Sequence, residues 1–516
     1  MSEVRDLLIV GGGINGVAVA RDAAGRGLSV LLCEKGDLAG ATSSASSKLI
    51  HGGLRYLEHG QFHLVREGLA EREVLLRMAP HLVHPLRFVL PQGPGARPRW
   101  MVRAALYLYD RLGGARTLLG SEAVELRRDP LGAPLRDSAR FGFAYSDCRT
   151  DDARLTIVTA RDAAFRRAEI ATRTALVAAR RDAGIWRAVL RDGNGASREV
   201  AARILVNAAG PWVLDVLGRA GLSTRARLRL VKGSHIVVPE LYAGDHAYLL
   251  QNDDRRIVFV MPFERDYSLI GTTELPFAGD PAEAQITPEE VAYLCRAVAR
   301  WFEAPPRPDD VVWSYAGVRP LYEDDARSAA SVSRDYVFDL DVDGAAAPAL
   351  SIFGGKLTTH RRLAEHALAR LAPYLPAGGP PWTAGSALPG GEVLPAGGVA
   401  ALAADLARRY PFLATANAAR LAQGYGTTAY DILGDAKGAA ALGRDFGQGL
   451  SEVELRWLID REWARTAEDV LWRRTKLGLA ATLEEVRKLT EYLAQCKPLS
   501  ALQGGEGGAQ RAALGG

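Results

Sequence analysis

The sequence predicts an α/β protein in three parts: a Rossmann-like dinucleotide-binding domain that is discontinuous along the chain, a β-rich second domain, and an α-helical C-terminal domain. Three observations support this prediction. The chain begins with a complete strand, glycine turn, helix and second strand. Two later buried strands also end in glycine turns that lead into helices. Beyond residue 398 the strand patterns stop, and the sequence is rich in Leu, Ala and Arg, which is typical of helices.

The N-terminal unit has the form of a dinucleotide-binding motif. An apolar strand over 7–10 leads into the glycine turn Gly11-x-Gly13-x-x-Gly16, and a helix of small residues follows over 17–25. A second strand over 28–33 then ends at the acid Glu34. In this motif the glycines permit a tight turn, a close approach to a pyrophosphate and close helix–strand packing, and the helix N-terminus faces the phosphates. The acid favours a free ribose 2′-hydroxyl, which disfavours NADP. The unit alone does not distinguish NAD from FAD.

A loop rich in small and hydroxyl residues, 41–60, leaves the end of the second strand, beside the expected cofactor cleft. Its serines, among them Ser43 and Ser47, could donate to phosphate or ring atoms. Arg55 and Tyr56 add a cation and a phenol near its end. An amphipathic helix is predicted next, over 61–78.

Residues 97–114 contain a tryptophan, two tyrosines and arginines at both ends. An interfacial helix on an anionic bilayer has this composition, and so does a buried helix capped by arginines. Both interpretations stay open.

The next segments alternate between helix and strand. A helix is predicted over 151–167 and a strand over 169–178, followed by a hairpin of 186–190 with 199–205. A second strand–glycine–helix junction, which contains Gly210, follows over 204–213. The residues between 112 and 140 read as loop.

The segment 229–345 has closely spaced strands and no glycine–phosphate motif, so it is predicted to be a substrate domain laid over the cofactor domain. Thr287 and Pro288 begin its predicted helix. Its aromatic-rich last strand delivers Arg319, and Arg334 follows fifteen residues later.

A third junction reads LSIFGGKLTTH, with Lys356 between two glycines and a helix. Three such junctions in distant parts of one chain predict a cofactor domain that closes around one ligand. The predicted division is 1–80, 146–228 and 346–375 for the cofactor domain, 81–145 and 229–345 for the substrate domain, 376–398 for a Pro/Gly linker, 399–500 for the helical domain and 501–516 for a disordered tail.

Composition limits the alternatives. The 516 residues carry a net charge of +4 with scattered arginines, which argues against a nucleic-acid-binding protein. The four cysteines lie far apart, so neither a metal site nor a disulfide framework is expected, and a reducing compartment fits.

The start of the chain does not read as a signal peptide. The longest uncharged stretch, 371–391, holds five prolines and five glycines, so any membrane contact is expected to be peripheral.

The sequence closely resembles the FAD-dependent glycerol-3-phosphate dehydrogenases of the respiratory chain, especially the bacterial aerobic enzyme. The matching stretches run from residue 11 to about residue 478: GGGINGVAVARDAAGRGLSV, ATSSASSKLIHGGLRYLEHG, YSDCRTDDARL, KGSHIVVP, IGTTE, YAGVRPL, FGGKLTTHRRLAEHAL and DVLWRRTKLG. The resemblance implies FAD rather than NAD and the fold of the amino-acid-oxidase-like flavoproteins. It also implies oxidation of sn-glycerol 3-phosphate to dihydroxyacetone phosphate, with hydride passing from C2 to the flavin and electrons to membrane quinone.

The resemblance also implies roles for residues. A phosphate dianion requires guanidinium groups, for which Arg55, Arg319 and Arg334 are the candidates, with Tyr56 as a hydroxyl donor. His51 is expected to be the base, with His235 as the alternative, and Lys356 to stabilise negative charge. The residues expected to bind FAD are Gly11, Gly13, Ile14, Asn15, Gly16, Glu34, Thr42, Ser43, Ser47, Lys48, Leu49, Gly210, Gly354, Gly355, Lys356, Leu357 and Thr358.

Three other functions stay open: an oxidase that gives electrons to oxygen, a flavin-binding scaffold without turnover, and an NAD-linked dehydrogenase. The oxidase branch of the family carries an inserted segment before the third junction, whereas 334–353 is compact here, which favours the dehydrogenase. The expected partners are membrane quinone, the membrane surface and a second copy of the chain. The expected location is the cytoplasmic face of the cell membrane, or the cytoplasm.

Overall fold

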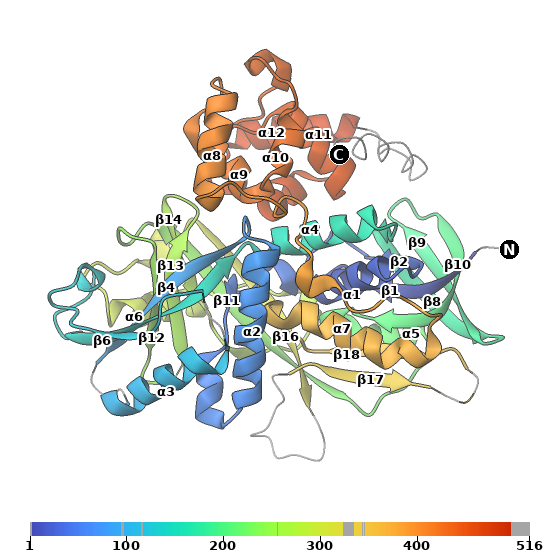
Figure 1. The fold of residues 1–516 in the computed structure, drawn as a ribbon, viewed down its shortest axis with the longest axis horizontal. Coiled ribbons are helices and arrows are strands. Elements are labelled where there is room, and N and C mark those ends of the chain that lie inside the picture. Colours follow the sequence, from blue (N-terminus) through green and yellow to red (C-terminus); the bar gives the residue numbers. More distant parts are fainter. Residues whose placement is uncertain are drawn as a thin grey trace.

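The computed structural model describes residues 3–93, 97–114, 117–254, 256–323, 335–342, 344 and 346–496. Two sheets lie side by side, and the C-terminal helices, drawn in orange and red, stand above them (Figure 1). This arrangement confirms the predicted fold class of an α/β cofactor domain, a β-rich domain and a helical domain.

The first sheet brings together strands from three distant parts of the chain. Its main strand order is β17-β18-β10-β1-β2-β7, with the hairpin β8–β9 paired to β10. The strand bounds are β1 Val4–Val10, β2 Val30–Cys33, β7 Glu169–Ala171, β8 Thr174–Asp182, β9 Ile185–Asp192, β10 Ser197–Asn207, β17 Val337–Asp341 and β18 Ala349–Phe353. Since β1, β10 and β18 run parallel as neighbours, the three glycine junctions meet at one edge of this sheet.

Helices cover the first sheet because their apolar and small residues pack against its buried strands. The helix α1, Ile14–Gly25, is almost entirely buried and lies between α4, Asp152–Phe165, and α7, His360–Leu371. The short helix α5, Val213–Arg219, follows the second junction. Asp151 caps α4 by accepting from the backbone N–H of Arg154.

The second sheet has the strand order β15-β11-β14-β13-β12-β4-β6-β3, with β16 paired to β11 and β5 to β6. The bounds are β3 Leu49–Ile50, β4 Val83–Gln92, β5 Glu122–Val124, β6 Phe141–Thr150, β11 Arg227–Pro239, β12 His246–Gln251, β13 Ile257–Phe263, β14 Tyr267–Gly271, β15 Leu275–Pro276 and β16 Trp313–Glu323. Helix α6, Pro288–Ala299, packs on one face and begins with a capping box between Thr287 and Glu290, as predicted from Thr287 and Pro288.

The helices α2, Phe62–Met78, and α3, Arg99–Leu112, lie near the other face of the second sheet and pack against each other. In Figure 1, α3 lies at the lower left edge of the molecule. Within the described residues, no helix is both long and apolar enough to cross a membrane.

The C-terminal domain has a core of its own. Its helices are α8 Gly398–Arg409, α9 Thr415–Tyr425, α10 Thr428–Leu433, α11 Glu452–Glu462, the π-helical turn Asp469–Arg474 and α12 Leu483–Gln495. Buried ion pairs tie this domain to the first sheet and its helices, among them Arg154 with Glu462 and Arg474 with Asp37.

Several elements differ from the expectation. The segment 169–178 forms two strands, β7 and β8, and the predicted loop 112–140 contains β5. Residues 337–341, assigned to the segment 229–345, instead pair with β18 in the first sheet, because that strand offers a free antiparallel edge to their apolar residues. The linker is docked rather than free, since Trp382 fills the space over Gly25 and Leu388 is fully buried.

Candidate active site

A cavity of ≈ 1200 Å³ lies where the edge of the first sheet meets the second sheet. All three strand–glycine–helix junctions contribute to its wall, together with the loop that follows β2 and with strands β13 and β16. The segments expected to hold a dinucleotide therefore meet in one place.

The first junction fits a dinucleotide. Gly11 has a φ of +116°, and a Cβ there would lie 2.5 Å from the carbonyl oxygen of Ala208, so this turn requires glycine. A Cβ on Gly16 would lie 2.0 Å from the carbonyl oxygen of Gly11; Gly16 itself is not in the cavity wall and permits the close helix–strand packing. The start of α1 thus faces the cavity, where a phosphate is stabilised by the helix N-terminus.

Asn15 joins the first junction to the third. Its Nδ2 donates to the carbonyl oxygen of Gly354 at 3.1 Å. Its Oδ1 is buried in the cavity wall without a hydrogen-bond partner among the described residues. A buried acceptor normally has a partner, so this atom indicates a site for a ligand donor.

Glu34 stands at the carboxyl end of β2. Its two carboxylate oxygens accept from the backbone N–H groups of Gly12 and Gly36, each at 2.7 Å. Burial raises the pKa of this carboxyl group, and the two hydrogen bonds oppose that rise. The carboxylate is held rigidly in the cavity wall, and each oxygen has a second lone pair for a ribose hydroxyl.

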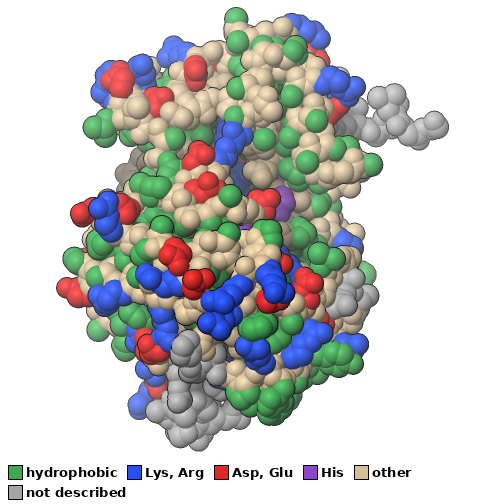
Figure 2. Space-filling view, turned by 90° about the vertical axis from the view of Figure 1, so that its left-hand side faces the viewer, with side chains coloured by type: hydrophobic (Ala, Val, Ile, Leu, Met, Phe, Trp, Pro, Cys, Tyr) green, Lys and Arg blue, Asp and Glu red, His purple; other side chains and the backbone are tan. Residues whose placement is uncertain are grey.

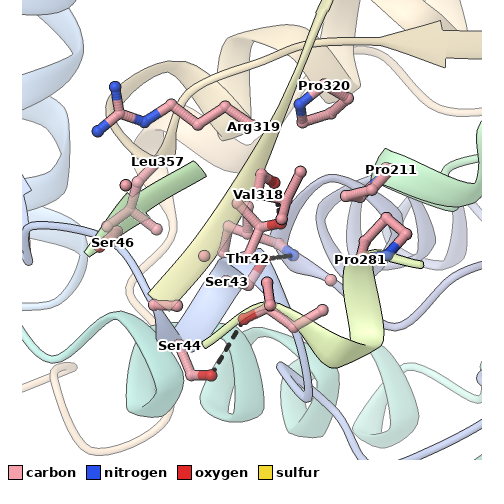
Figure 3. Close-up of a pocket in the computed structure, with 18 of the residues that line it drawn as sticks. Thr42, Ser43, Ser44, Ser46, Pro211, Pro281, Val318, Arg319, Pro320 and Leu357 are labelled. Atoms are coloured by element: carbon pink, nitrogen blue, oxygen red, sulfur yellow. Dashed lines mark hydrogen bonds between the residues drawn. The ribbon is translucent and has the colours of Figure 1, made fainter. Parts of the chain in front are cut away.

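The hydroxyl residues of the loop after β2 mostly stabilise the loop itself. Thr42 donates to the carbonyl oxygen of Val318 at 2.7 Å, and Ser43 accepts from the backbone N–H of Ile14 at 2.9 Å. Figure 3 shows Thr42 meeting Val318, with Arg319 on the side of Leu357 and Ser46. A hydroxyl that accepts can still donate its own hydrogen to a ligand.

Lys48 does not reach this cavity. Its ammonium group donates to Asp152 at 2.7 Å and to the carbonyl oxygen of Ser44 at 3.0 Å, and its side chain is buried. The lysine therefore stabilises the loop after β2 on the side away from the cavity, whereas its neighbour Leu49 lines the cavity.

In another part of the cavity wall, the structure brings together His51, Tyr56, Arg319 and Lys356. The Lys356 ammonium lies 4.0 Å from the centre of the Tyr56 ring, a cation–π distance. Arg319 lies 3.5 Å from the carboxylate of Glu274. Two cations thus line the region that holds His51. The main chain of His51 exchanges hydrogen bonds with the Thr358 hydroxyl, at 3.2 and 3.4 Å.

The charge state of His51 suits a base. Burial lowers the pKa of its imidazole, Lys356 and Arg319 lower it further, and Asp147 alone among these groups raises it. The ring is therefore neutral near pH 7 and can accept a proton.

His235, the alternative base, does not line the cavity. It is 1% exposed, its Nε2 lies 2.9 Å from the Ser47 hydroxyl, and its ring stacks on Tyr315 with centroids 4.8 Å apart. Burial holds its pKa well below the usual range. Periodicity could not predict this, because the residue faces the loop of Ser47 only after the sheets have assembled.

Two expected arginines cannot be placed. Arg334 and the side chain of Arg55 lie outside what the structure describes. The remaining expected cofactor contacts, from Gly13, Gly210, Gly354, Gly355 and Leu357, all lie in the cavity wall.

The C-terminal domain contributes to the cavity, which the sequence analysis missed. Glu468, Trp472 and Arg473 line it. Trp472 stacks on Trp313 of β16 with ring centroids 4.4 Å apart, and Arg473 binds Asp37 at 2.6 Å. The available signal was the stretch DVLWRRTKLG, one of the segments that carry the family resemblance.

The fold and the cavity define a dinucleotide-binding protein, and the family models identify its class as that of the FAD-dependent oxidoreductases. A family model described as FAD dependent oxidoreductase matches residues 6–345, and one described as the C-terminal domain of alpha-glycerophosphate oxidase matches residues 382–499.

Three curated relatives are similar over nearly the whole chain. A glycerol-3-phosphate dehydrogenase of Pseudomonas aeruginosa is 50% identical and aligns over 96% of each chain. A D-erythritol 1-phosphate dehydrogenase of Brucella abortus is 49% identical, over 95% of this chain and 98% of its own. The aerobic glycerol-3-phosphate dehydrogenase of Escherichia coli is 47% identical, over 96% of this chain and 98% of its own.

A solved structure agrees. The glycerol-3-phosphate dehydrogenase of Bacillus halodurans, complexed with FAD, superposes with a TM-score of 0.74 at 27% identity, over 96% of this chain and 92% of that one. The chain belongs to the family of FAD-dependent glycerol-3-phosphate dehydrogenases, and FAD is its cofactor. The resemblance found in the sequence is confirmed.

Proposed function

We propose that this protein oxidises sn-glycerol 3-phosphate to dihydroxyacetone phosphate and passes the electrons to membrane quinone. The observation that carries the proposal is the convergence of His51, Arg319 and Lys356, from three distant segments, in the wall of the cavity that the three glycine junctions also line. The near-full-length identity to glycerol-3-phosphate dehydrogenases supports it.

Arg319 binds the substrate phosphate in this proposal, because a guanidinium group pairs with a phosphate dianion through two parallel hydrogen bonds. Glu274 holds the same guanidinium at 3.5 Å. That ion pair is partly exposed and therefore weak, so a phosphate dianion can compete with it.

His51 takes the proton from the C2 hydroxyl. FAD, when bound, supplies the acceptor for the hydride that leaves C2. A neutral imidazole suits the proton transfer, and Lys356 next to it stabilises the negative charge that develops on the substrate oxygen. The ring face of Tyr56 holds the Lys356 ammonium through a cation–π contact.

D-erythritol 1-phosphate is a second candidate substrate. It too is a phosphorylated polyol, and the Brucella abortus relative is almost as similar as the Pseudomonas aeruginosa one, at 49% against 50% identity. Anaerobic titration of the yellow protein with each compound separates them. If glycerol 3-phosphate bleaches the flavin at a lower concentration than D-erythritol 1-phosphate does, the main proposal is supported. If neither compound bleaches the flavin, neither is the substrate.

The electron acceptor is tested by the products of steady-state turnover. A dehydrogenase reduces an added ubiquinone analogue and releases little hydrogen peroxide, whereas an oxidase consumes oxygen and releases peroxide in equal amount. If peroxide release dominates, the electron acceptor is oxygen, and the quinone part of the proposal is wrong.

Helix α3 supports contact with the membrane surface. It buries Val102, Leu106 and Tyr109 against the second sheet, while Trp100 is 70% exposed and Tyr107 53% exposed. Figure 2, which views the side of the molecule that carries α3 in Figure 1, shows hydrophobic and basic side chains interleaved over its lower part. Exposed aromatic residues among arginines favour an anionic lipid surface.

Vesicle flotation tests this contact. Trp100→Ser should weaken binding to anionic vesicles, and Val393→Ser, at an exposed apolar residue of another region, should not. Equal binding by all three proteins would remove α3 from the membrane contact.

A further inference from the structure

A buried hydrogen-bond chain leads from helix α3 to the segment that carries His51. Tyr109, on the inner face of α3, is 2% exposed. Its hydroxyl accepts from the backbone N–H of Gly52 at 2.9 Å and donates to Asp147 at 2.7 Å. The other Asp147 oxygen accepts from Arg72 at 2.8 Å.

The segment of His51 and Gly52 is held from both sides. Thr358, from the third glycine junction, binds the main chain of His51, and Tyr109 binds the main chain of Gly52. A Cβ on Gly52 would lie 2.7 Å from Leu69 and 2.9 Å from the Tyr109 oxygen, so the segment fits closely between α2 and α3.

The orientation of the His51 ring depends on this backbone support. In the part of the chain that the structure describes, no side chain or carbonyl group forms a hydrogen bond to the ring nitrogens of His51. Other catalytic histidines are commonly oriented through such a bond. Here the position of the main chain decides where the ring points.

We propose that Tyr109 is a positioning residue for the oxidation: through its hydroxyl, the surface helix α3 holds the His51–Gly52 main chain so that the imidazole faces the substrate. This inference rests on the proposed role of His51 as the base. Misplacement of a reacting group by about 1 Å costs on the order of a hundredfold in rate, so a small shift of this segment is enough to matter.

The phenol suits this position because one oxygen can accept and donate at once. Burial and the nearby Asp147 raise the pKa of Tyr109 well above its usual value, so the hydroxyl keeps its proton at any working pH. A phenylalanine would keep the packing against Tyr145 but would leave the Gly52 N–H group without a partner.

Tyr109→Phe is the direct test, with flavin content measured first. We expect kcat for glycerol 3-phosphate to fall about tenfold or more while KM stays within about twofold, since the phosphate contact at Arg319 is untouched. An unchanged kcat in a protein with full flavin content would overturn the proposal.

Tyr425→Phe is the matched control. Tyr425 is also buried, donates to the carboxylate of Glu454 at 2.7 Å, and that carboxylate also pairs with an arginine, Arg420. The variant removes the same type of hydrogen bond inside the C-terminal domain and should lower Tm without changing kcat. An equal loss of kcat in both variants would reduce the effect to general destabilisation and overturn the proposal.

Asp147→Asn keeps the test decisive if Tyr109→Phe does not fold. The asparagine keeps the shape of Asp147 but accepts a weaker hydrogen bond from Tyr109. It also removes the negative charge that faces His51, so Lys356 and Arg319 remain as the charged neighbours of His51. We expect a lower kcat, and an acid limb of the pH profile at lower pH. A wild-type kcat and profile would overturn the proposal.

His51→Asn separates this inference from the proposed function. If His51→Asn abolishes turnover and Tyr109→Phe is fully active, only the positioning role of Tyr109 is wrong. If His51→Asn keeps wild-type turnover, the role of His51 as the base is wrong, and the positioning role of Tyr109 is overturned with it.

Discussion

At the scale of the residue, the site is a set of charges placed around one neutral imidazole. Arg319 and Lys356 lower the pKa of His51 by their charge and so help to keep its imidazole unprotonated. In the proposed mechanism the same two cations also bind the substrate phosphate and stabilise the negative charge that develops on the substrate oxygen.

Arg319→Ala should raise KM for glycerol 3-phosphate by about ten- to a hundredfold, since a hydrogen bond to a charged group contributes about 1.5–3 kcal/mol. Steady-state kinetics at saturating quinone measure it. Glu274→Gln is the control: it removes the carboxylate that competes for Arg319 and should leave KM equal or lower. A wild-type KM in Arg319→Ala would remove this arginine from the phosphate site.

The pH profile should report the pKa of His51. Burial and the nearby Lys356 lower that pKa, so kcat/KM should fall in acid only below the ordinary histidine value of about 6.5. Lys356→Met removes one group that lowers the pKa, so the acid limb should move to higher pH. Lys488→Met, on the exposed face of α12, should leave the limb in place. A limb unmoved in Lys356→Met would show that another group titrates.

At the scale of the element, the turn between β1 and α1 depends on the absence of side chains. The Cβ of an alanine at 16 would lie 2.0 Å from a backbone oxygen, so the turn would have to open. This turn lines the cavity, and in dinucleotide-binding folds such a turn holds the phosphates, so we expect its geometry to control FAD binding.

Gly16→Ala should therefore yield a protein that is largely colourless after purification, measured by the flavin absorbance per chain. Gly218→Ala is the control, because that glycine lies on an exposed face of α5 with no atom within 4 Å of the added Cβ. It should keep full flavin content and gain stability, by about 0.4–1 kcal/mol. Full flavin content in Gly16→Ala would contradict the role assigned to this turn.

At the scale of the whole molecule, the C-terminal domain is part of the catalytic unit. Arg474 is fully buried, donates to Asp37 beside the FAD cavity, and also binds the carbonyl oxygen of Glu462. Trp472 next to it reaches the strand that carries Arg319, six residues along from Trp313. The domain thus contacts two separate segments of the cavity wall, the loop of Asp37 and the strand β16.

Arg474→Leu should lower the free energy of unfolding by about 3 kcal/mol, because it leaves a buried carboxylate with fewer partners. Denaturant unfolding followed by flavin and tryptophan fluorescence measures it. Arg408→Leu, which removes an exposed ion pair with Asp405, should change stability by less than about 1 kcal/mol. Equal effects of the two variants would contradict a structural role for the interdomain pair.

The sequence by itself determined the fold class and the three glycine junctions, and it predicted most of the junction residues that the structure places in the cavity wall. Those features depend on short-range stereochemistry: a buried strand, a turn without side chains and a helix start within about ten residues, and parallel strands whose carboxyl ends meet at one edge. The family resemblance added FAD and the phosphorylated substrate.

Only the tertiary structure decided which side chains face the cavity. The sequence made His51 the expected base and His235 the alternative, and the structure shows that His51 lines the cavity whereas His235 lies outside its wall and contacts the Ser47 hydroxyl. Likewise, Tyr109 reads as one aromatic residue of an amphipathic helix, and its hydrogen bond to Gly52 joins residues 57 positions apart. Burial and hydrogen-bond partners of this kind are set by contacts between distant segments, which local patterns of residues do not encode.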